Sequence, residues 1–218
     1  MPKKENDKFA KERILDTAEE LFAQNGYSAV SVRQITTLAQ CNLAAVNYHF
    51  GNKKNLYLEV FRSRLVANGK QVSLSFERNL AARPAPTLVD VVHALAQAFL
   101  EDGPLSDEER ERHSQLMARE MTKPIGAMEI VIDEVMQPLF ESVACRLRPH
   151  LKEGIDDESL TLKILSIFAM VTHFNFARAA ISRITGREYD TAFKTRLVDH
   201  IIEFSTKGLG VVQKEEDK

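Results

Sequence analysis

The chain has 218 residues, of which 28 % are charged, and its formal net charge is −2. This length predicts one or two domains with a substantial core. Two cysteines without a CxxC spacing exclude a disulfide-stapled secreted scaffold and favour a reducing compartment. The most apolar run, residues 164–171, is far shorter than the roughly 20 residues that span a bilayer, and no apolar signal segment opens the chain. We therefore expect a cytoplasmic protein without a membrane partner.

The charge is unevenly distributed along the chain. Residues 1–56 hold eight Lys and Arg against six Asp and Glu, a local +2 that leaves −4 for the remainder. This asymmetry is typical of a nucleic-acid module on an acidic body, although +2 does not establish DNA binding by itself. Residues 1–8 and 213–218 are expected to be charged, disordered tails.

Residues 31–57 predict two short helices joined by a tight turn. Ser31 and Gln34 form a capping box that opens the first helix, and its inward face carries an apolar residue at each helical repeat: Val32, Ile35 and Ala39. Asn42 is a suitable N-cap for the second helix. The inward stripe of that helix is expected to hold Leu43, Val46 and Phe50.

The opposite side of the second helix combines small methyl groups with hydrogen-bonding side chains, namely Ala44, Ala45, Asn47, Tyr48 and His49. Small residues allow a helix to enter a major groove, where Asn can pair with an adenine edge and Ala can touch a thymine methyl group. Residues 26–56 contain three cations and no acid. An acid-free surface suits contact with phosphates, so this segment predicts a DNA-reading module.

Individual roles follow from side-chain chemistry. Ser31 at a helix N-terminus, the phenol of Tyr48 and the ammonium of Lys53 are the candidates for positioning phosphates. The base-reading or groove-lining candidates are Arg33, Leu43, Ala45, Asn47 and His49, with Asn42 and Ala44 beside them. The alternative role of Arg33 is a surface ion pair. The alternative roles of His49 are helix capping and packing beside Phe50.

This stretch resembles the helix-turn-helix of the tetracycline-repressor (TetR) family of bacterial regulators. The resemblance covers residues 10–61, and the matching positions are Ile14, Leu15, Ala18, Leu21, Phe22, Gly26, Tyr27, Tyr48, Phe50, Lys53 and Leu56. Two positions depart from the family pattern, since Gln40 replaces the usual turn glycine and Thr36 the usual alanine. Gln40 puts the turn's backbone angles in question, because a non-glycine residue at positive φ costs about 1 kcal/mol.

The rest of the chain predicts further helices, because glycine is scarce and strand alternation with hairpin dipeptides is absent. The segments in chain order are a long helix over 53–80, a linker at 83–86, a helix opened by the Thr87–Asp90 capping box, a break at 101–105 and a helix opened by Ser106 and Glu109. A helix over 126–151 follows, in which Pro138 should produce a kink or an extra break, and then two strongly apolar helices over 158–185 and 190–209. We expect the last two to be buried on more than one side.

The sequence offers no constellation for catalysis or metal binding. The histidines form no HxH or HExxH spacing, the carboxylate pairs sit at helix starts, and Gly208-Leu209-Gly210 is no phosphate loop. Cys41 and Cys145 are expected to fill apolar positions. We therefore expect no enzyme, no metal and no cofactor.

The resemblance implies an all-α protein with a three-helix DNA-binding domain over residues 1–52 and a larger helical domain over 53–218 for effector binding and dimerisation. One recognition helix reads only a few base pairs, so a dimer with two heads about 34 Å apart should bind a palindromic operator. The family pairs through its last two helices. The candidate interface residues are Phe168, Thr172, Ala179, Phe193, Leu197, His200, Ile201 and Phe204.

The resemblance also implies a small-molecule effector in the helical body. The candidate lining residues are His93, Phe99, Met117, Arg119, Glu120, Met121, Met128, Ile132, Met136, Phe140, His173, Phe174 and Phe176. Met and Phe at helical spacing are ordinary core residues more often than pocket walls. Residues 119–124, with Pro138-Leu139 downstream, resemble the body of the enteric CerR-type regulators, which names no ligand.

The leading hypothesis is a homodimeric TetR-type transcriptional repressor that leaves its operator when an effector binds. Activation or dual control stays open, because groove reading does not fix the sign of control. The alternative from another class is a helical small-molecule-binding protein or enzyme with a vestigial DNA-binding module. A helical scaffold is the third hypothesis, and it predicts neither operator binding nor an occupied cavity.

Overall fold

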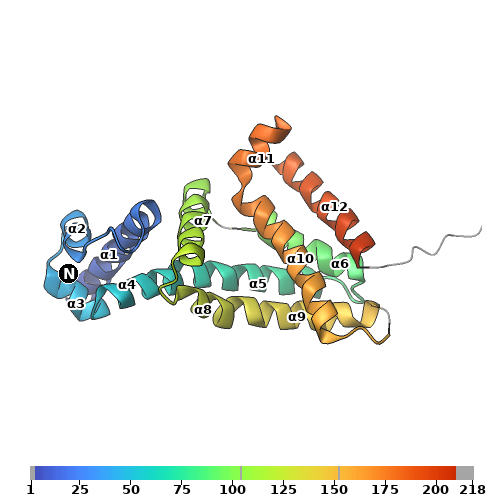
Figure 1. Cartoon of the computed structure of the whole chain (residues 1–218), viewed down its shortest axis with the longest axis horizontal. Coiled ribbons are helices and arrows are strands. Elements are labelled where there is room, and N and C mark those ends of the chain that lie inside the picture. Colours follow the sequence, from blue (N-terminus) through green and yellow to red (C-terminus); the bar gives the residue numbers. More distant parts are fainter. Residues whose placement is uncertain (1–2, 104, 152, 210–218) are drawn as a thin grey trace, which may run out of the picture. The chain divides into compact units, whose positions relative to one another are not determined.

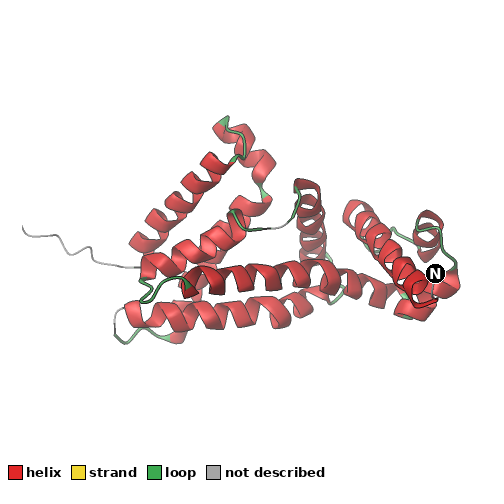
Figure 2. Ribbon diagram, turned by 180° about the vertical axis from the view of Figure 1, so that it is seen from behind, coloured by secondary structure: helices red, strands yellow, loops and turns green. Residues whose placement is uncertain are grey.

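The computed structural model describes residues 3–103, 105–151 and 153–209, and every regular element within them is a helix (Figures 1 and 2). This confirms the all-α prediction. The elements are α1 (Lys3–Asn25), α2 (Val32–Leu38), α3 (Leu43–Phe50), α4 (Lys53–Val60), the π-helical η1 (Phe61–Val66), α5 (Ala67–Ala81), α6 (Leu88–Leu100), α7 (Asp107–Thr122), α8 (Ala127–Val131), the π-helical η2 (Ile132–Met136), α9 (Gln137–Leu147), the short η3 (Arg148–His150), α10 (Asp157–Phe176), α11 (Arg178–Thr185) and α12 (Thr191–Gly208).

The helices form two compact units. The first contains the chain up to Gly69 together with Leu105–Val135, and the second contains the rest. The first unit therefore holds α7 and α8 as well as the predicted DNA-binding helices. The boundary predicted between residues 52 and 53 follows the sequence resemblance and remains a prediction.

The core of the first unit is built on α1. Its buried face carries Ile14, Leu15, Ala18 and Phe22, each at most 1 % exposed, at the spacing of one helical stripe. Helices α2, α3, α4 and α7 all contact α1. Burial of this stripe removes several large apolar side chains from water, which stabilises the unit by about 1.5–3 kcal/mol for each such side chain.

A buried carboxylate on α1 ties α7 to this core. Glu19 is 4 % exposed and contacts two guanidinium groups and an imidazole, with Arg64 Nε and Arg112 Nε each at 3.3 Å and His113 Nε2 at 3.5 Å. Burial raises the pKa of Glu19, but the hydrogen bond and charge of His113 and the charge of Arg112 outweigh it, so the pKa lies below its ordinary value. The paired charge is thereby satisfied inside the unit.

The helix starts follow local sequence signals. The three predicted capping boxes are present at Ser31, Thr87 and Ser106, and Asn42 caps α3 by accepting a hydrogen bond from the backbone N–H of Ala45 at 2.9 Å. Each cap joins residues three positions apart, so it forms whenever the chain turns into a helix at that point.

Three predicted helices are interrupted. The helix predicted over 53–80 contains the π-helical segment η1. The helix over 126–151 contains η2 directly before α9, and Pro138 lies in the first turn of α9. That π turn accommodates the proline, which cannot donate a backbone hydrogen bond inside a helix. The prediction of one helix over 158–185 was wrong, because α10 ends at Phe176 and α11 begins at Arg178.

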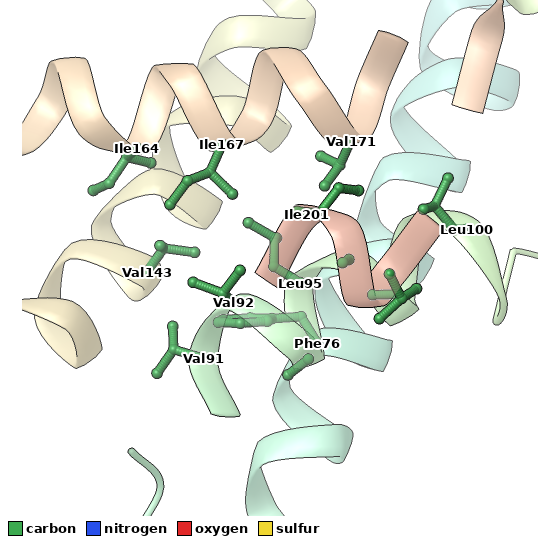
Figure 3. Close-up of a cluster of buried hydrophobic side chains, with 14 of the residues drawn as sticks. Phe76, Val91, Val92, Leu95, Leu100, Val143, Ile164, Ile167, Val171 and Ile201 are labelled. Atoms are coloured by element: carbon green, nitrogen blue, oxygen red, sulfur yellow. The ribbon is translucent and has the colours of Figure 1, made fainter. Parts of the chain in front are cut away.

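The core of the second unit surrounds α6. Its side chains alternate large aliphatic residues with alanines, and eight of its positions are buried: Leu88, Val91, Val92, Ala94, Leu95, Ala96, Ala98 and Leu100. Figure 3 shows side chains of α5, α9, α10 and α12 pointing towards this helix, among them Phe76, Val143, Ile167 and Ile201. The most enclosed helix is therefore α6.

Two local predictions were wrong. Cys145 is exposed, because it falls on the outer face of α9, whereas Cys41 is half-buried and burial raises its pKa. The N-terminal tail predicted over residues 1–8 is helical from Lys3, where α1 begins. The C-terminal tail predicted over residues 213–218 lies outside the described residues.

Candidate nucleic-acid interface

Helix α3 presents one apolar face inward and one chemically mixed face outward. Val46 is fully buried and Phe50 is 7 % exposed, whereas Tyr48 is 78 % exposed and Leu43 is 55 % exposed. Leu43 was predicted both to face inward and to line a groove, and its exposure excludes the inward orientation. Three more outward candidates, Asn42, Ala44 and Asn47, are exposed, and Ala45 is half-buried beside them.

Lys53 opens helix α4 and lies against an aromatic ring. Its Nζ is 4.3 Å from the centroid of the Tyr27 ring, and burial lowers its pKa. A cation over an aromatic face is held by the ring quadrupole. The N-cap Asn52 accepts a hydrogen bond from the N–H of Asn55 at 2.9 Å. Lys53 is the first residue of α4, so its positive charge and the positive end of the helix both favour a phosphate.

Ser31 is exposed at the start of α2, as expected for a phosphate-positioning residue, but its hydroxyl is already engaged. Its Oγ donates to Gln34 Oε1 at 3.0 Å and accepts from the backbone N–H of Gln34 at 3.2 Å. A phosphate contact would have to replace the first of these bonds, while the helix N-terminus itself remains available.

Arg33 and His49 each had two interpretations. Arg33 is exposed, and no carboxylate lies within ion-pair distance of it among the residues that the structure describes. Its alternative as a surface ion pair is therefore unsupported. The half-buried ring of His49 lies 5.0 Å from the ring of Tyr48 and 6.0 Å from that of Phe50, so it packs as the alternative expected.

The turn between α2 and α3 has the strained backbone that the sequence raised as a question. Gln40 has φ of 50°, which makes it the one non-glycine residue at positive φ among those described. Arg13 of α1 donates from Nε to the carbonyl of Ala39 at 3.2 Å and from Nη2 to the carbonyl of Gln40 at 3.5 Å. The turn geometry survives the loss of glycine because a distant arginine holds its carbonyls.

Sequence reasoning missed part of this surface. Leu38 at the end of α2 is 63 % exposed, and it lines a shallow hollow of about 420 Å³ together with Ser31, Arg33, Gln34 and Thr37. Leu38 follows Ile35 by three residues, the spacing of a buried stripe, so the sequence gives no signal of its exposure. We add Leu38 and Thr37 to the candidates for groove contact.

The predicted dimer face requires a correction. Phe193, Leu197 and Ile201 are buried in the core of their own unit, so they cannot meet a partner. Ala179, His200 and Phe204 are exposed, and Phe168 and Thr172 are half-buried. The sequence missed Leu162 and Leu165, which are 56 % and 42 % exposed on α10.

Helix α10 is also apolar enough, by length and composition alone, to cross a membrane. Only 28 % of its most apolar stretch is buried within the chain. The apolar run noted over residues 164–171 is the centre of this longer helix. A helix that packs in a core on one side and against a partner on the other meets the same criteria.

The candidate effector residues do not gather at one site. Six belong to the first unit (Met117, Arg119, Glu120, Met121, Met128 and Ile132), and the other seven belong to the second. In the second unit, Phe168 links Phe99 and Phe140, with ring centroids 5.2 Å and 5.1 Å away. His93, Met136 and Phe174 are half-buried, while His173 and Phe176 are exposed.

Two of these candidates are unsuited to a pocket wall. Glu120 is fully buried, and its Oε1 accepts hydrogen bonds from the backbone N–H groups of Ile125, Gly126 and Ala127. Met121 is 72 % exposed on the surface of α7. Glu120 therefore fixes the start of α8, and Met121 lines no enclosed space.

Comparison with known proteins gives two family matches. Residues 14–60 match the model for bacterial regulatory proteins of the tetR family, and residues 87–209 match the C-terminal domain of the HTH-type transcriptional dual regulator CecR. The second match names the CecR type where the sequence resemblance had suggested the CerR type.

Individual relatives agree with these matches. CecR of Shigella flexneri is 24 % identical over 88 % of this chain and 87 % of its own length, and QacR of Staphylococcus aureus is 42 % identical over 23 % of this chain and 27 % of its own. A tetR-family regulatory protein of Rhodococcus RHA1 has the same fold, with a TM-score of 0.64 at 15 % identity over 94 % of this chain and 98 % of that one.

The members of this family are DNA-binding transcriptional regulators, not enzymes. The N-terminal match contains α2 and α3, whose outward face carries the groove-reading candidates, and the C-terminal match contains the aromatic cluster and the dimer candidates. The chain thus belongs to the tetR family of bacterial regulatory proteins, and its helical body is of the CecR type.

Proposed function

We propose that this regulator binds a palindromic operator as a cytoplasmic homodimer and leaves it when a small molecule occupies its helical body. The observation that supports operator binding best is the outward face of α3. Tyr48 is 78 % exposed there, and the segment from Gly26 to Leu56 contains no acid to repel a phosphate.

The roles of single residues follow from this arrangement. Tyr48 and Lys53 bind phosphates and set the position of α3, whereas Asn47, Ala44 and Arg33 face the base edges. Tyr48 can donate its phenol hydrogen from an exposed position, and Lys53 lies at the positive end of α4. Phosphate contacts of this kind raise affinity for every DNA sequence, so selectivity rests on Asn47, Ala44 and Arg33.

Dimerisation is proposed through the exposed faces of α10 and α12. Leu162 and Leu165 on α10 and Phe204 on α12 are exposed apolar side chains, and the ring of His200 joins the two helices by contacting Phe174 and Phe204. Covering such a face with a second copy removes its apolar area from water. The resulting pair of α3 helices can read two half-sites.

The effector is proposed to act in the second unit, beside the rings of Phe99, Phe140 and Phe168. Binding of the effector favours one arrangement of the helical body and thereby weakens DNA binding. By linkage, DNA weakens effector binding by the same factor. Both repression and activation of transcription are compatible with this coupling. The Shigella relative is described as a dual regulator.

A mobility-shift assay with the DNA upstream of the protein's own gene tests the proposal. We expect the effector-free protein to retard this DNA at low salt and the variant Tyr48→Phe to bind it more weakly. Failure of the wild-type protein to bind at low salt would contradict the proposal and favour a small-molecule-binding protein with a vestigial DNA module.

A further inference from the structure

A cavity of about 440 Å³ in the first unit opens to solvent, and seven of its eleven lining residues are exposed. Its walls come from the end of α1 and the loop that follows it, from Tyr57 of α4, and from the last turns of α7 with the loop to α8. Cavities that hold small molecules in proteins commonly measure about 300–1,000 Å³. The size of this cavity is therefore that of a binding site, and one of the helices around it, α4, begins at the phosphate candidate Lys53.

The charge of the wall is entirely positive. Arg119 and Lys123 line the cavity, and none of its lining residues is acidic. Neither cation forms an ion pair with a carboxylate among the residues that the structure describes. The carboxylate next in the chain, Glu120, is buried and is occupied by hydrogen bonds from Tyr57 and from the start of α8.

Backbone carbonyls hold two of the three nitrogens of the Arg119 guanidinium, and the third, Nη1, is left to bind a ligand. Its Nε donates to the carbonyl of Ala23 at 2.8 Å and its Nη2 to that of Gln24 at 2.5 Å. Its Nη1 lies beside Gly26, where a Cβ would be only 3.0 Å away, and Gly26 has φ of 79°. The backbone angle favours glycine here, and Nη1 remains to donate to an anion.

The remaining wall combines aromatic and apolar side chains with three neutral polar residues, Asn25, Ser28 and Thr122. The rings of Tyr27 and Tyr57 lie 5.2 Å apart at an angle of 70°, and Ile125 lines the same cavity. Flat apolar groups pack favourably against such rings, and carboxylates pair well with guanidinium and ammonium groups. The lining therefore suits a small aromatic carboxylate.

Tyr27 connects this cavity to the proposed DNA contacts. Its ring lines the cavity and also holds the ammonium of Lys53, 4.3 Å from the ring centroid. We infer that the cavity binds a small aromatic carboxylate, and that occupation changes DNA affinity by moving Tyr27 and with it Lys53. The second half of this inference rests on the proposed function, whereas the first half does not.

The binding step is tested without DNA. Thermal unfolding of the full chain is followed with benzoate, 1-naphthoate and indole-3-acetate, and with the corresponding neutral amides. We expect at least one carboxylate to raise the unfolding temperature and its amide to have no effect. Inorganic phosphate at equal ionic strength should not produce the same rise. Equal effects of carboxylate and amide, equal protection by phosphate, or no effect of any carboxylate would each overturn the inference.

Variants then locate the site. Lys123→Gln should weaken binding about tenfold, the loss of one charge-assisted contact, and Ala118→Leu should block the cavity. Lys8→Gln, which removes another exposed lysine charge on α1 away from the cavity lining, is the matched control. Unchanged binding in both Lys123→Gln and Ala118→Leu would overturn the assignment to this cavity. If one of the two variants does not fold, unchanged binding in the other has the same consequence.

The coupling is tested with operator DNA. A saturating carboxylate should change the DNA affinity of the wild-type protein but not that of Tyr27→Leu, which removes the ring that holds Lys53. Carboxylate binding without any change in wild-type DNA affinity would overturn the coupling. Absence of DNA binding even without the carboxylate would instead count against the proposed function and leave the binding result standing.

Discussion

Gln40 occupies a backbone conformation that disfavours every residue with a side chain. Its φ of 50° brings Cβ close to the following carbonyl, at a cost of about 1–2 kcal/mol for an L-residue. Two hydrogen bonds from Arg13 to the carbonyls of Ala39 and Gln40 offset part of this cost. Residue 13 thus supports the geometry of the turn from 26 residues upstream.

We expect Gln40→Gly to stabilise the protein. Glycine relieves the strain but loses about 0.5–1 kcal/mol through the greater freedom of the unfolded chain, so the net gain should be about 0.5–1 kcal/mol. Urea unfolding measures it, provided that the slope of the transition stays constant. Gln115→Gly, placed inside α7 at negative φ, should lose stability under the same conditions. A lower unfolding midpoint for Gln40→Gly would contradict this account of the turn.

Glu120 is a buried charge that replaces the missing cap of α8. Gly126, the N-cap of α8, has no side chain, and the N–H groups of Ile125, Gly126 and Ala127 donate to Glu120 at 2.7–2.9 Å instead. Burial raises the pKa of Glu120, but these donors and the Tyr57 hydroxyl lower it below its ordinary value of 4.5. Burial and the Glu120 carboxylate raise the pKa of Tyr57 in turn.

Glu120→Gln should lower the free energy of unfolding by about 2 kcal/mol near neutral pH, because it removes the charged acceptor of several buried hydrogen bonds. A carboxylate with a depressed pKa stabilises the folded state fully above pH 4.5 and loses this effect as the pH falls further. The difference between the two proteins should therefore shrink below about pH 4.5. Unfolding at several pH values measures it, and a difference independent of pH would refute the role of the charge.

Helices α6 and α10 show how far the sequence predicts an element. The caps of α2, α6 and α7 were predictable because each is a contact between residues three positions apart. The break at Ala177 was not, since neither glycine nor proline marks it. Apolarity alone also could not tell which face of α12 its own core uses, so Phe193, Leu197 and Ile201 were assigned to a partner although they pack against α6 and α10.

The exposed face of α10 carries a prediction of its own. Leu165→Glu should convert the dimer into a folded monomer at micromolar concentration, because a buried unpaired charge would oppose association. Leu74→Glu changes an exposed leucine of α5 outside the proposed interface and should leave the dimer intact. Sedimentation equilibrium measures both. A dimer that persists in Leu165→Glu, with circular dichroism unchanged, would place the interface elsewhere.

At the scale of the whole molecule, the proposed dimer doubles each DNA contact. Every phosphate neutralised by a cation releases counterions, so affinity falls with salt at a slope that counts these contacts. The DNA-facing surface was predictable from sequence at the level of residue types, because α3 is short and its buried stripe, Val46 and Phe50, fixes its outward side. The contribution of Leu38 required the structure, since it depends on where α2 ends.

Lys53→Ala should weaken binding to operator and unrelated DNA alike and should reduce the slope of log affinity against log salt by about 2 for a dimer. Lys194→Ala, on α12, removes a charge of the same kind outside the DNA-binding helices and should change neither quantity. Fluorescence anisotropy across a salt series provides both slopes. An unaltered slope for Lys53→Ala would remove this residue from the DNA contacts.

Hydroxyl-radical footprinting on the DNA upstream of the gene tests the central claim most directly, namely that two α3 helices enter successive major grooves. We predict two protected half-sites of related sequence, with centres about 34 Å or a multiple of it apart, and loss of both in Leu165→Glu. A single protected site, or protection that survives in the monomeric variant, would contradict the two-headed arrangement.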